Sequence, residues 1–475
     1  MENKGGNRKM ALFGTNGVRG IVNKELTPET ALNLARSLAA FLWERKSETD
    51  CRTAPTVILG TDTRISGMML KSAAAAGLLA SGVTVVDVGI VPTPSLQYYV
   101  KNRAEADAGI IITASHNPRE YNGLKLIASD GTEFSREDEK IVEKIYHSQK
   151  FIAADWLKTG GIRFENNCNE EYLTGILAII DRKAIEKKSF KIVTDTGNGA
   201  GSLTMPDLMS RLGCRVLALG AQPDGTFPWR NPEPLPEALQ EAAAVMRESA
   251  FDLGVAQDGD ADRAVFIDEN GDFIDDEIML AAVEKYVLHK EKGPVVTTVG
   301  TSLCFTDIAK DEEAEIYYTA IGSVDVGRKM AEVGAVYGGE GNGGIIYPRH
   351  QICRDGAMAA ALVLEMMAHT GMKASEIKDT VPVYFNKKTK IRLSVPDLEN
   401  AMAEIADKII AASDLLEYSE IDRTDGLKLW FGGRAWLLIR PSGTEPIIRI
   451  TAEAKSEEEV LKYLEIGKKY VSEIA

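Results

Sequence analysis

A serine stands at the end of an apolar stretch in the segment GIIITASHNPREYNGLK (109–125). The apolar residues predict a buried strand that delivers Ser115 and His116, and Pro118 stops its regular continuation. Since α/β domains place their chemistry at the C-terminal ends of strands, Ser115 is a candidate reactive group. A turn whose serine and asparagine cap a helix is the plainer alternative. A serine nucleophile activated by His116 is the other. Adjacent side chains are expected to point apart and there is no GxSxG elbow, which argues against a hydrolase triad.

Three aspartates alternate in the segment AQDGDADRAVFIDENG (256–271). In an extended loop Asp258, Asp260 and Asp262 converge as oxygen ligands, and Mg²⁺ prefers such carboxylates together with a phosphate oxygen. The spacing also matches the start of an EF-hand. However, Arg263 stands where the calcium loop needs glycine, and the flanking residues are strand-like. A solvated acidic turn is the remaining alternative, but the apolar residues on both sides would bury three carboxylates without a counter-charge.

A glycine-rich segment, VYGGEGNGGIIYPRHQICRDG (336–356), presents the carboxylate of Glu340 and the amide of Asn342. Its GxGxxG spacing matches the dinucleotide fingerprint. Because IIYP continues as a strand and Pro348 ends it, no helix can open there, and the dinucleotide interpretation is rejected. A carboxylate and an amide on a loop that allows close approach suit paired hydrogen bonds to sugar hydroxyls. A structural turn is the alternative for this segment alone.

Two further segments suit an anion. In IRPSGTEPIIRI (439–450), hydroxyls, backbone N–H groups and a guanidinium are predicted to form an anion-binding loop between strands; its residues are Arg440, Ser442, Gly443 and Thr444. In ALFGTNGVRGIVN (11–23), Arg19 lies among glycines, which fits a backbone-pinned cation near an anionic centre. A plain turn explains the second segment equally well.

The elements that must position these residues form a repeated pattern. Three stretches, 55–89, 190–220 and 293–322, each read as a β-branched strand, a polar loop, a helix and a second strand. Three βαβ units predict three similar α/β domains. From about residue 380 the pattern changes to antiparallel strands with two helices, a compact α+β unit. We therefore expect four domains, with the boundaries 1–158, 159–272, 273–378 and 379–475.

Composition narrows the class of function. The net charge of −15, from 55 basic and 70 acidic residues, argues against a protein that coats nucleic acid or an anionic membrane. An anionic small molecule stays compatible, because local arginines and lysines can reverse the field in a cleft. No apolar run approaches the about 20 residues of a membrane span, and the first ten residues hold no signal-peptide core. Five singly scattered cysteines indicate reduced thiols in a cytoplasmic protein.

Together, five motifs resemble those of the α-D-phosphohexomutases, in the family's order and across essentially the full chain. The motifs are FGTNGVRG, TASHNP followed by YNGLK, DGDADR, GEGNGG and RPSGTEP. The combination is very specific, although GEGNGG alone is weak. The resemblance implies four domains around one central cleft, three of them α/β domains of mixed sheet and the fourth a smaller α+β domain. It also implies a phosphosugar substrate, Mg²⁺ and a sugar 1,6-bisphosphate activator, and it is compatible with a homo-oligomer.

Carried over by motif, the resemblance gives each residue an expected role. Ser115 would be the phosphoserine, and Mg²⁺ would be held by its phosphate with Asp258, Asp260 and Asp262. Arg19 and Lys125 would lie beside the transferring group, with His116 and Arg263 in support, and Lys125 would be a general acid/base whose pKa is lowered by neighbouring cations. Glu340 and Asn342 would bind sugar hydroxyls. The non-reacting phosphate would be held by Arg440, Ser442, Gly443 and Thr444. Loop 319–327 matches another sugar-contacting segment only loosely.

The chain departs from the family pattern in two places. Thr61 replaces the first arginine of a G-R-D-T-R-x-S-G motif, and the sugar loop has Asn342 and Gly344 where several subfamilies have serine and histidine. FGTNGVRG and RPSGTEP look most like the phosphoglucosamine mutase branch, particularly its archaeal-type members. Conversion of glucosamine 6-phosphate to glucosamine 1-phosphate is therefore the expected reaction, with phosphomannomutase/phosphoglucomutase as the runner-up. A metal-dependent phosphatase and a non-catalytic phosphosugar-binding protein are more distant alternatives.

Overall fold

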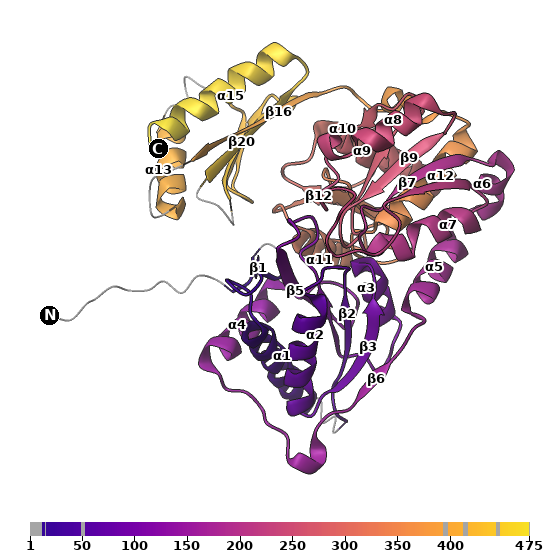
Figure 1. The fold of residues 1–475 in the computed structure, drawn as a ribbon. Helices are drawn as coiled ribbons and strands as arrows, with labels where there is room; N and C mark the ends of the chain where they lie inside the picture. The colour runs from indigo at the N-terminus through magenta and orange to yellow at the C-terminus, as the bar shows by residue number, and fades with distance from the viewer. Residues whose placement is uncertain are drawn as a thin grey trace.

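The computed structural model describes residues 12–14, 16–48, 53–392, 398–411, 417–442 and 447–474. The chain forms four domains, each built on its own sheet (Figure 1). In the view of Figure 1 the first domain lies at the bottom, the second at the right, the third in the centre, and the fourth, in yellow, at the upper left. The prediction of three similar mixed-sheet α/β domains and a smaller α+β domain is confirmed. None of the described helices has the length and apolar character needed to cross a membrane.

The first domain has a six-stranded sheet in the order β1-β5-β4-β2-β3-β6. Its elements are β1 (Val18–Ile21), α1 (Pro28–Glu48), β2 (Thr56–Thr61), α2 (Gly67–Ala80), β3 (Thr84–Ile90), α3 (Thr93–Lys101), β4 (Ala108–Ile112), β5 (Tyr121–Ala128), α4 (Arg136–Ser148), η1 (Trp156–Lys158) and β6 (Ile162–Phe164). β4 is apolar and buried throughout, as its sequence predicts for a strand covered on both faces. Antiparallel β5 pairs with both β4 and β1, which brings three separate segments to one edge of the sheet.

The second and third domains follow the same plan. The second comprises α5 (Cys168–Ile179), α6 (Arg182–Lys188), β7 (Lys191–Asp195), η2 (Ala200–Leu203), α7 (Met205–Arg211), β8 (Arg215–Leu219), η3 (Pro236–Ala238), α8 (Gln240–Glu248), β9 (Leu253–Gln257), β10 (Ala264–Ile267) and β11 (Phe273–Ile274). The third comprises α9 (Asp276–Lys290), β12 (Val295–Thr298), α10 (Leu303–Asp311), β13 (Ile316–Thr319), α11 (Ser323–Val333), β14 (Tyr337–Glu340), β15 (Gly344–Ile346), α12 (Gly356–Thr370) and η4 (Ala374–Thr380).

The three domains share one strand arrangement. In each, a first strand lies between two parallel neighbours, and an antiparallel strand follows beside the second neighbour: β3-β2-β4-β5, β8-β7-β9-β10 and β13-β12-β14-β15. The last two strands of each set are joined directly, as the pairs β4–β5, β9–β10 and β14–β15. The repeat predicted from sequence pattern is thus present in the topology.

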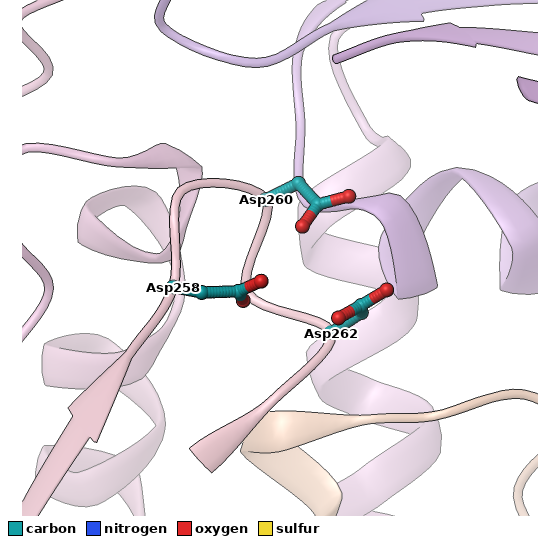
Figure 2. A group of neighbouring side chains, drawn as sticks. All are labelled: Asp258, Asp260 and Asp262. Carbon is teal, nitrogen blue, oxygen red and sulfur yellow. The ribbon is translucent and has the colours of Figure 1, made fainter. Parts of the chain in front are cut away.

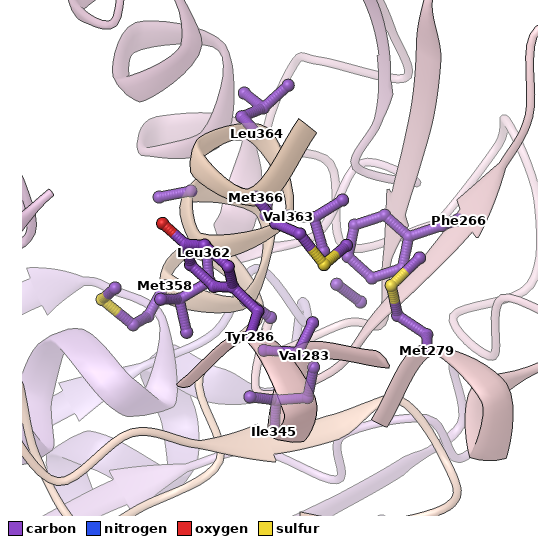
Figure 3. Packing of buried hydrophobic residues seen from close by; sticks show 14 of the residues in the cluster. Phe266, Met279, Val283, Tyr286, Ile345, Met358, Leu362, Val363, Leu364 and Met366 are labelled. Carbon is purple, nitrogen blue, oxygen red and sulfur yellow. The ribbon is translucent and has the colours of Figure 1, made fainter. Parts of the chain in front are cut away.

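The second and third domains share a continuous hydrophobic core, which the sequence did not predict. Phe266 of β10, Met279 and Val283 of α9, and Ile345 of β15 belong to one buried cluster (Figure 3). Helix α12 lies inside this cluster, and all its residues from 356 to 368 are buried. Because dense cores resist deformation, the two domains are expected to behave as one body.

The fourth domain is an antiparallel sheet in the order β16-β20-β19-β18-β17. Its elements are β16 (Phe385–Arg392), α13 (Leu398–Ala411), β17 (Glu420–Asp422), β18 (Leu427–Phe431), β19 (Ala435–Pro441), β20 (Ile447–Ala454) and α15 (Glu457–Ser472). One sheet face packs against α13 and α15 through Leu437 and Ile450. The other face meets the third domain, where Lys428 Nζ donates to the carbonyl of Val299 over 2.6 Å.

Candidate active site

The residues predicted to carry chemistry lie on equivalent loops of the three similar domains. Ser115 is in the β4–β5 loop, the three aspartates are in the β9–β10 loop, and Glu340 and Asn342 are at the β14–β15 turn. Each loop therefore follows the third parallel strand of its domain and precedes the antiparallel one. This common position at the carboxyl ends of parallel strands places all three loops where open α/β sheets hold ligands.

Ser115 is fully buried and held in a strained backbone conformation, with φ at +52°. Its Oγ donates to Asp258 Oδ2 over 2.7 Å, and its N–H donates to Thr113 Oγ1 over 2.8 Å. Its Oγ also lies 3.4 Å from His116 Nδ1. The premise that adjacent Ser115 and His116 side chains point apart is therefore wrong, because the left-handed backbone turns them toward each other.

Arg64 fixes the Ser115 loop through the loop's backbone carbonyls. Its guanidinium donates to four backbone carbonyls of that loop, at 2.7 to 2.9 Å: those of Ser115, Asn117, Pro118 and Tyr121. Asp62 fixes the guanidinium in turn, accepting from Nε over 3.1 Å. Asp62 and Arg64 thus support the loop, although Thr61 stands where the G-R-D-T-R-x-S-G motif has its first arginine.

The three aspartates converge as the sequence predicts (Figure 2). Each offers one carboxylate oxygen within 4.8 Å of the others, and all three residues are buried. Asp260 Oδ1 and Asp262 Oδ1 are buried and accept no hydrogen bond from a described residue. Unpaired buried carboxylate oxygens are what a hard, oxygen-seeking cation such as Mg²⁺ requires, so the residues present fit this metal.

The other oxygens of the cluster are occupied by protein donors. Asp260 Oδ2 accepts from Lys125 Nζ over 2.7 Å and from Thr93 Oγ1 over 2.6 Å. Asp262 Oδ2 accepts from Lys125 Nζ over 3.2 Å and from Arg354 Nη2 over 2.5 Å. The triad is thus partly neutralised by two buried cations, Lys125 and Arg354, which supply the counter-charge that three buried carboxylates need.

Burial and neighbouring charge separate the pKa values of the triad. Burial, and then the charges of Asp262 and Asp260, raise the pKa of Asp258 to about 7. Burial also opposes ionisation of the other two, but Lys125 lowers the pKa of Asp260, and Arg354 with Lys125 lowers that of Asp262. The cations thus favour the ionised forms of Asp260 and Asp262, whereas burial and its two acidic neighbours oppose ionisation of Asp258.

The predicted cations lie beside this cluster. Arg19 on β1 stands opposite Gly123 in the β1–β5 pairing, and its Nη1 donates to Asn117 Oδ1 over 3.0 Å. Lys125 lies on β5 and is 1% exposed. Burial opposes its charge, but Asp260 and Asp262 outweigh burial and raise its pKa. The expectation that neighbouring cations lower this pKa is therefore reversed, and Lys125 is an ammonium.

His116 and Arg263 complete the cluster. Burial, with the charges of Arg263 and Arg19, lowers the pKa of His116 to about 3, so its ring is neutral at physiological pH. Arg263 donates its backbone N–H to Asp258 Oδ1 over 3.3 Å. Its Nε lies 3.8 Å from Asp262 Oδ1, too far for a hydrogen bond, so the guanidinium remains available to an anion.

The sugar-loop residues line a cavity between the third and fourth domains. Glu340 and Asn342 meet Arg440 around this space of about 530 Å³, and Ile447 and Ile321 contribute apolar walls. The cavity also presents cations of the fourth-domain sheet, namely Lys388, Lys390 and Arg449. The site therefore has two neighbouring parts: the cluster around Ser115 and the three aspartates, and the cavity that contains Arg440. Glu340 belongs to the cavity lining and is linked to the cluster through Arg354.

Arg440 is held by an acid that sequence reasoning missed. Asp425 Oδ2 accepts from Arg440 Nη1 over 2.8 Å and from the Ile321 N–H over 3.1 Å, so it joins the fourth domain to the turn between β13 and α11. Of the segment 319–327, expected to be a loop, the part from Ser323 onward is helical. Ser442 follows β19 and donates its N–H to Ile447 O over 2.9 Å. Gly443 and Thr444, predicted to complete the anion-binding loop, lie outside the described residues.

Four family models match the chain in succession. They describe phosphoglucomutase/phosphomannomutase α/β/α domains I, II and III, at residues 10–153, 170–271 and 275–384, and the C-terminal domain at 391–466. The chain belongs to the phosphohexomutase family. The resemblance seen in its five motifs is confirmed. The boundaries expected after residues 158, 272 and 378 stay a prediction.

Named relatives agree on the reaction class. A phosphoglucomutase/phosphomannomutase of Thermococcus kodakarensis is 45% identical over 463 residues, 97% of this chain and 98% of that protein. A phosphoglucosamine/phosphogalactosamine mutase of Sulfurisphaera tokodaii is 40% identical over 450 residues, 94% of this chain and 96% of that protein. A family structure from Burkholderia thailandensis superposes with a TM-score of 0.83 at 25% identity, covering 98% of both chains. This phosphohexomutase thus has relatives of two sugar specificities.

Proposed function

We propose that this phosphohexomutase interconverts hexose 6-phosphates and hexose 1-phosphates by way of a phosphoserine at Ser115. The observation that carries the proposal is the buried contact of 2.7 Å between Ser115 Oγ and Asp258, inside a cluster of acids and cations. Phosphoryl transfer depends on positioning and charge neutralisation, and this cluster supplies both. A structural role for so many buried charges would be costly without a bound ligand.

In the proposed cycle, a substrate hydroxyl attacks the phosphorus of phosphoserine 115 and the P–Oγ bond breaks. Lys125 gives a proton to the departing Ser115 Oγ, and the proton lost by the attacking hydroxyl restores the Lys125 ammonium. The product is a sugar 1,6-bisphosphate and a free serine. The bisphosphate turns over, and its other phosphoryl group returns to Ser115 Oγ. Arg19, Lys125 and Arg263 would stabilise the transferring charge, and Lys125, as an ammonium, would act as the acid. His116, neutral and 3.4 Å from Oγ, would orient the serine.

Mg²⁺ would be held by Asp258, Asp260 and Asp262 together with the phosphate of Ser115. When bound, the ion supplies positive charge to the transferring phosphoryl group. A sugar 1,6-bisphosphate would act as activator, because it can place the first phosphoryl group on Ser115. The substrate's other phosphate would bind Arg440, Ser442, Gly443 and Thr444, and Glu340 and Asn342 would bind its hydroxyls.

The charge of the cavity supports a neutral hexose, such as glucose or mannose, as the first substrate. Its described acids are Glu340, which is paired with Arg354, and Glu277, whose pKa burial raises to about 8. A protonated amino sugar would therefore meet the nearby lysines. Of the two described acids in the lining, Glu340 has its charge balanced by Arg354, and Glu277 is largely protonated at neutral pH. Glucosamine phosphate, the sequence-based expectation, is the second candidate, and the Sulfurisphaera relative supports it.

The test is coupled turnover of glucose 1-phosphate, mannose 1-phosphate and glucosamine 6-phosphate, with Mg²⁺ and a matching 1,6-bisphosphate. A higher kcat/KM for the neutral sugars supports the first candidate, and a preference for glucosamine 6-phosphate supports the second. Ser115→Ala is expected to abolish turnover while leaving phosphosugar binding and folding intact. Ser95→Ala, at a buried serine outside the cluster, is the matched control. Full activity of Ser115→Ala would contradict the phosphoserine assignment.

A further inference from the structure

One buried arginine connects two of the equivalent loops. One is the β9–β10 loop with the three aspartates, called the metal loop below, and the other is the β14–β15 turn with Glu340 and Asn342, called the sugar loop. Arg354 follows β15, is 6% exposed, and forms an isolated bridge with Ile346. Its Nη2 donates to Asp262 Oδ2 over 2.5 Å, and its Nη1 donates to Glu340 Oε2 over 3.1 Å. A single guanidinium thus spans carboxylates from two domains and two equivalent loops.

The two contacts decide which oxygen of each carboxylate remains available. Arg354 occupies Asp262 Oδ2 and leaves Oδ1 without a hydrogen bond from any described residue, facing the triad. It occupies Glu340 Oε2 and leaves Oε1 with no partner in the described part of the chain. One oxygen is therefore presented to a metal and one to a ligand in the cavity. Arg354 is the side chain that contacts both carboxylates, and Lys125 assists it at Asp262 Oδ2.

Gly344 provides the space for this side chain. It stands opposite Glu340 in the β14–β15 pairing, so a side chain at 344 would lie next to the glutamate. A Cβ at this position would be 2.4 Å from Arg354 Cδ and 2.9 Å from Asn342 Oδ1. The glycine is thus required by the path of the arginine, because its own backbone is not in the left-handed region.

We propose that Arg354 is a positioning residue that couples sugar binding to metal binding, with Gly344 as its necessary partner. The inference rests on the proposed function, since it assigns a ligand to Glu340 and a metal to Asp262. When a sugar hydroxyl binds Glu340, the guanidinium is held more firmly and Asp262 with it. The reverse holds when the metal binds, since coupling between two sites is reciprocal.

The chemistry of the bridge calls for arginine. Its planar guanidinium presents two N–H groups in a fixed fork, so each carboxylate receives its own donor in a defined direction. A lysine would keep the positive charge but offers a compact point charge that cannot hold both acids in this geometry. Arg354→Lys therefore separates geometry from charge, and Gly344→Ala displaces the arginine without changing any charge.

The experiment measures metal binding and sugar binding separately. Mn²⁺ is the metal probe, followed by EPR in the full-length protein with and without saturating glucose 1-phosphate. In the wild type the sugar phosphate is expected to lower the Kd for Mn²⁺. In Arg354→Lys and in Gly344→Ala we expect this shift to disappear, the Kd for Mn²⁺ to rise about tenfold, and the KM for the sugar phosphate to rise. The double variant should be no worse than the poorer single one, because both lose the same contact.

Two controls frame the result. Arg328→Lys alters another arginine that joins two domains, through Glu133 and Asp130, and Gly161→Ala adds a methyl where no atom lies within 4 Å. Both are expected to leave the two constants unchanged. If Arg354→Lys does not fold, Gly344→Ala carries the test alone. A lowered Tm with both constants and the coupling preserved would overturn the proposal, as would a change in only one constant. A wild type without mutase activity would instead overturn the proposed function.

Discussion

Gly259 sets the distance between Ser115, the proposed phosphate carrier, and the aspartates proposed to bind the metal. It lies between Asp258 and Asp260, and a Cβ there would be 2.6 Å from the carbonyl oxygen of Ser115. That oxygen is backbone and is fixed by Arg64 Nη2 at 2.8 Å, so it cannot move aside as a flexible side chain could. Ordinary contact begins at 3.4 Å, so Gly259→Ala must separate the two loops by about 0.8 Å.

The expected cost falls on catalysis. A separation of this size lengthens the 2.7 Å contact between Ser115 Oγ and Asp258 beyond hydrogen-bond range. A misplacement of about 1 Å lowers rates about 100-fold, which corresponds to about 2.7 kcal/mol of transition-state stabilisation. Because we propose that the phosphosugar binds in the cavity beside the fourth domain, we expect kcat to fall and KM to change little.

The assay is coupled mutase turnover with Mg²⁺ and a 1,6-bisphosphate activator, together with mass spectrometry of the Ser115 peptide and a thermal melt. Gly161→Ala is the control for an added methyl in open space. A Gly259→Ala enzyme with a wild-type kcat and an unchanged Tm would refute the reasoning, because it would mean that the loops tolerate the separation.

Three other substitutions test separate contacts. Arg64→Lys keeps the charge but loses most of the N–H groups that donate to the carbonyls of the Ser115 loop; we expect a loss of about 2 kcal/mol or more in stability, measured by denaturant unfolding, and a lower kcat. Arg440→Ala should raise the KM for the phosphosugar about tenfold or more with kcat less affected. If steady-state assays give the variant the same KM and kcat as the wild type, the non-reacting phosphate binds elsewhere. Burial raises the pKa of Glu277 to about 8, above its unfolded value, so its contribution to stability is present at acidic pH and is lost as pH rises toward 8. Glu277→Gln should therefore raise Tm relative to the wild type more at pH 8.5 than at pH 5, and a pH-independent difference would contradict this assignment.

The separate motifs of the site could be predicted because the residues within each motif are close together in sequence. The alternating aspartates lie in one short loop, and that alternation alone brings three carboxylates together. The repeated βαβ pattern likewise predicted the three similar sheets, since each unit is local.

What could not be predicted depends on partners that are distant in sequence. Arg354 meets Asp262 across 92 positions, and Arg64 meets Ser115 across 51. Neither pairing leaves a spacing signal, although Gly344 marks the path of Arg354. The contact of Ser115 with His116 depends on a left-handed φ that a non-glycine residue seldom adopts, and the raised pKa of Lys125 depends on acids from another domain.

The equivalent loops have a mechanical consequence. The β9–β10 loop and the β14–β15 turn belong to domains that share a core. The Ser115 loop belongs to the first domain, whose larger buried cluster is separate and whose smaller one meets the second domain at Cys168. Two of the three equivalent loops are therefore carried by one packed body, and the loop that holds Ser115 is carried by the first domain. A movement of the first domain against that body would shift Ser115 and break the contacts of Lys125 and Thr93 with Asp260. Asp262 and Glu340 would stay joined through Arg354.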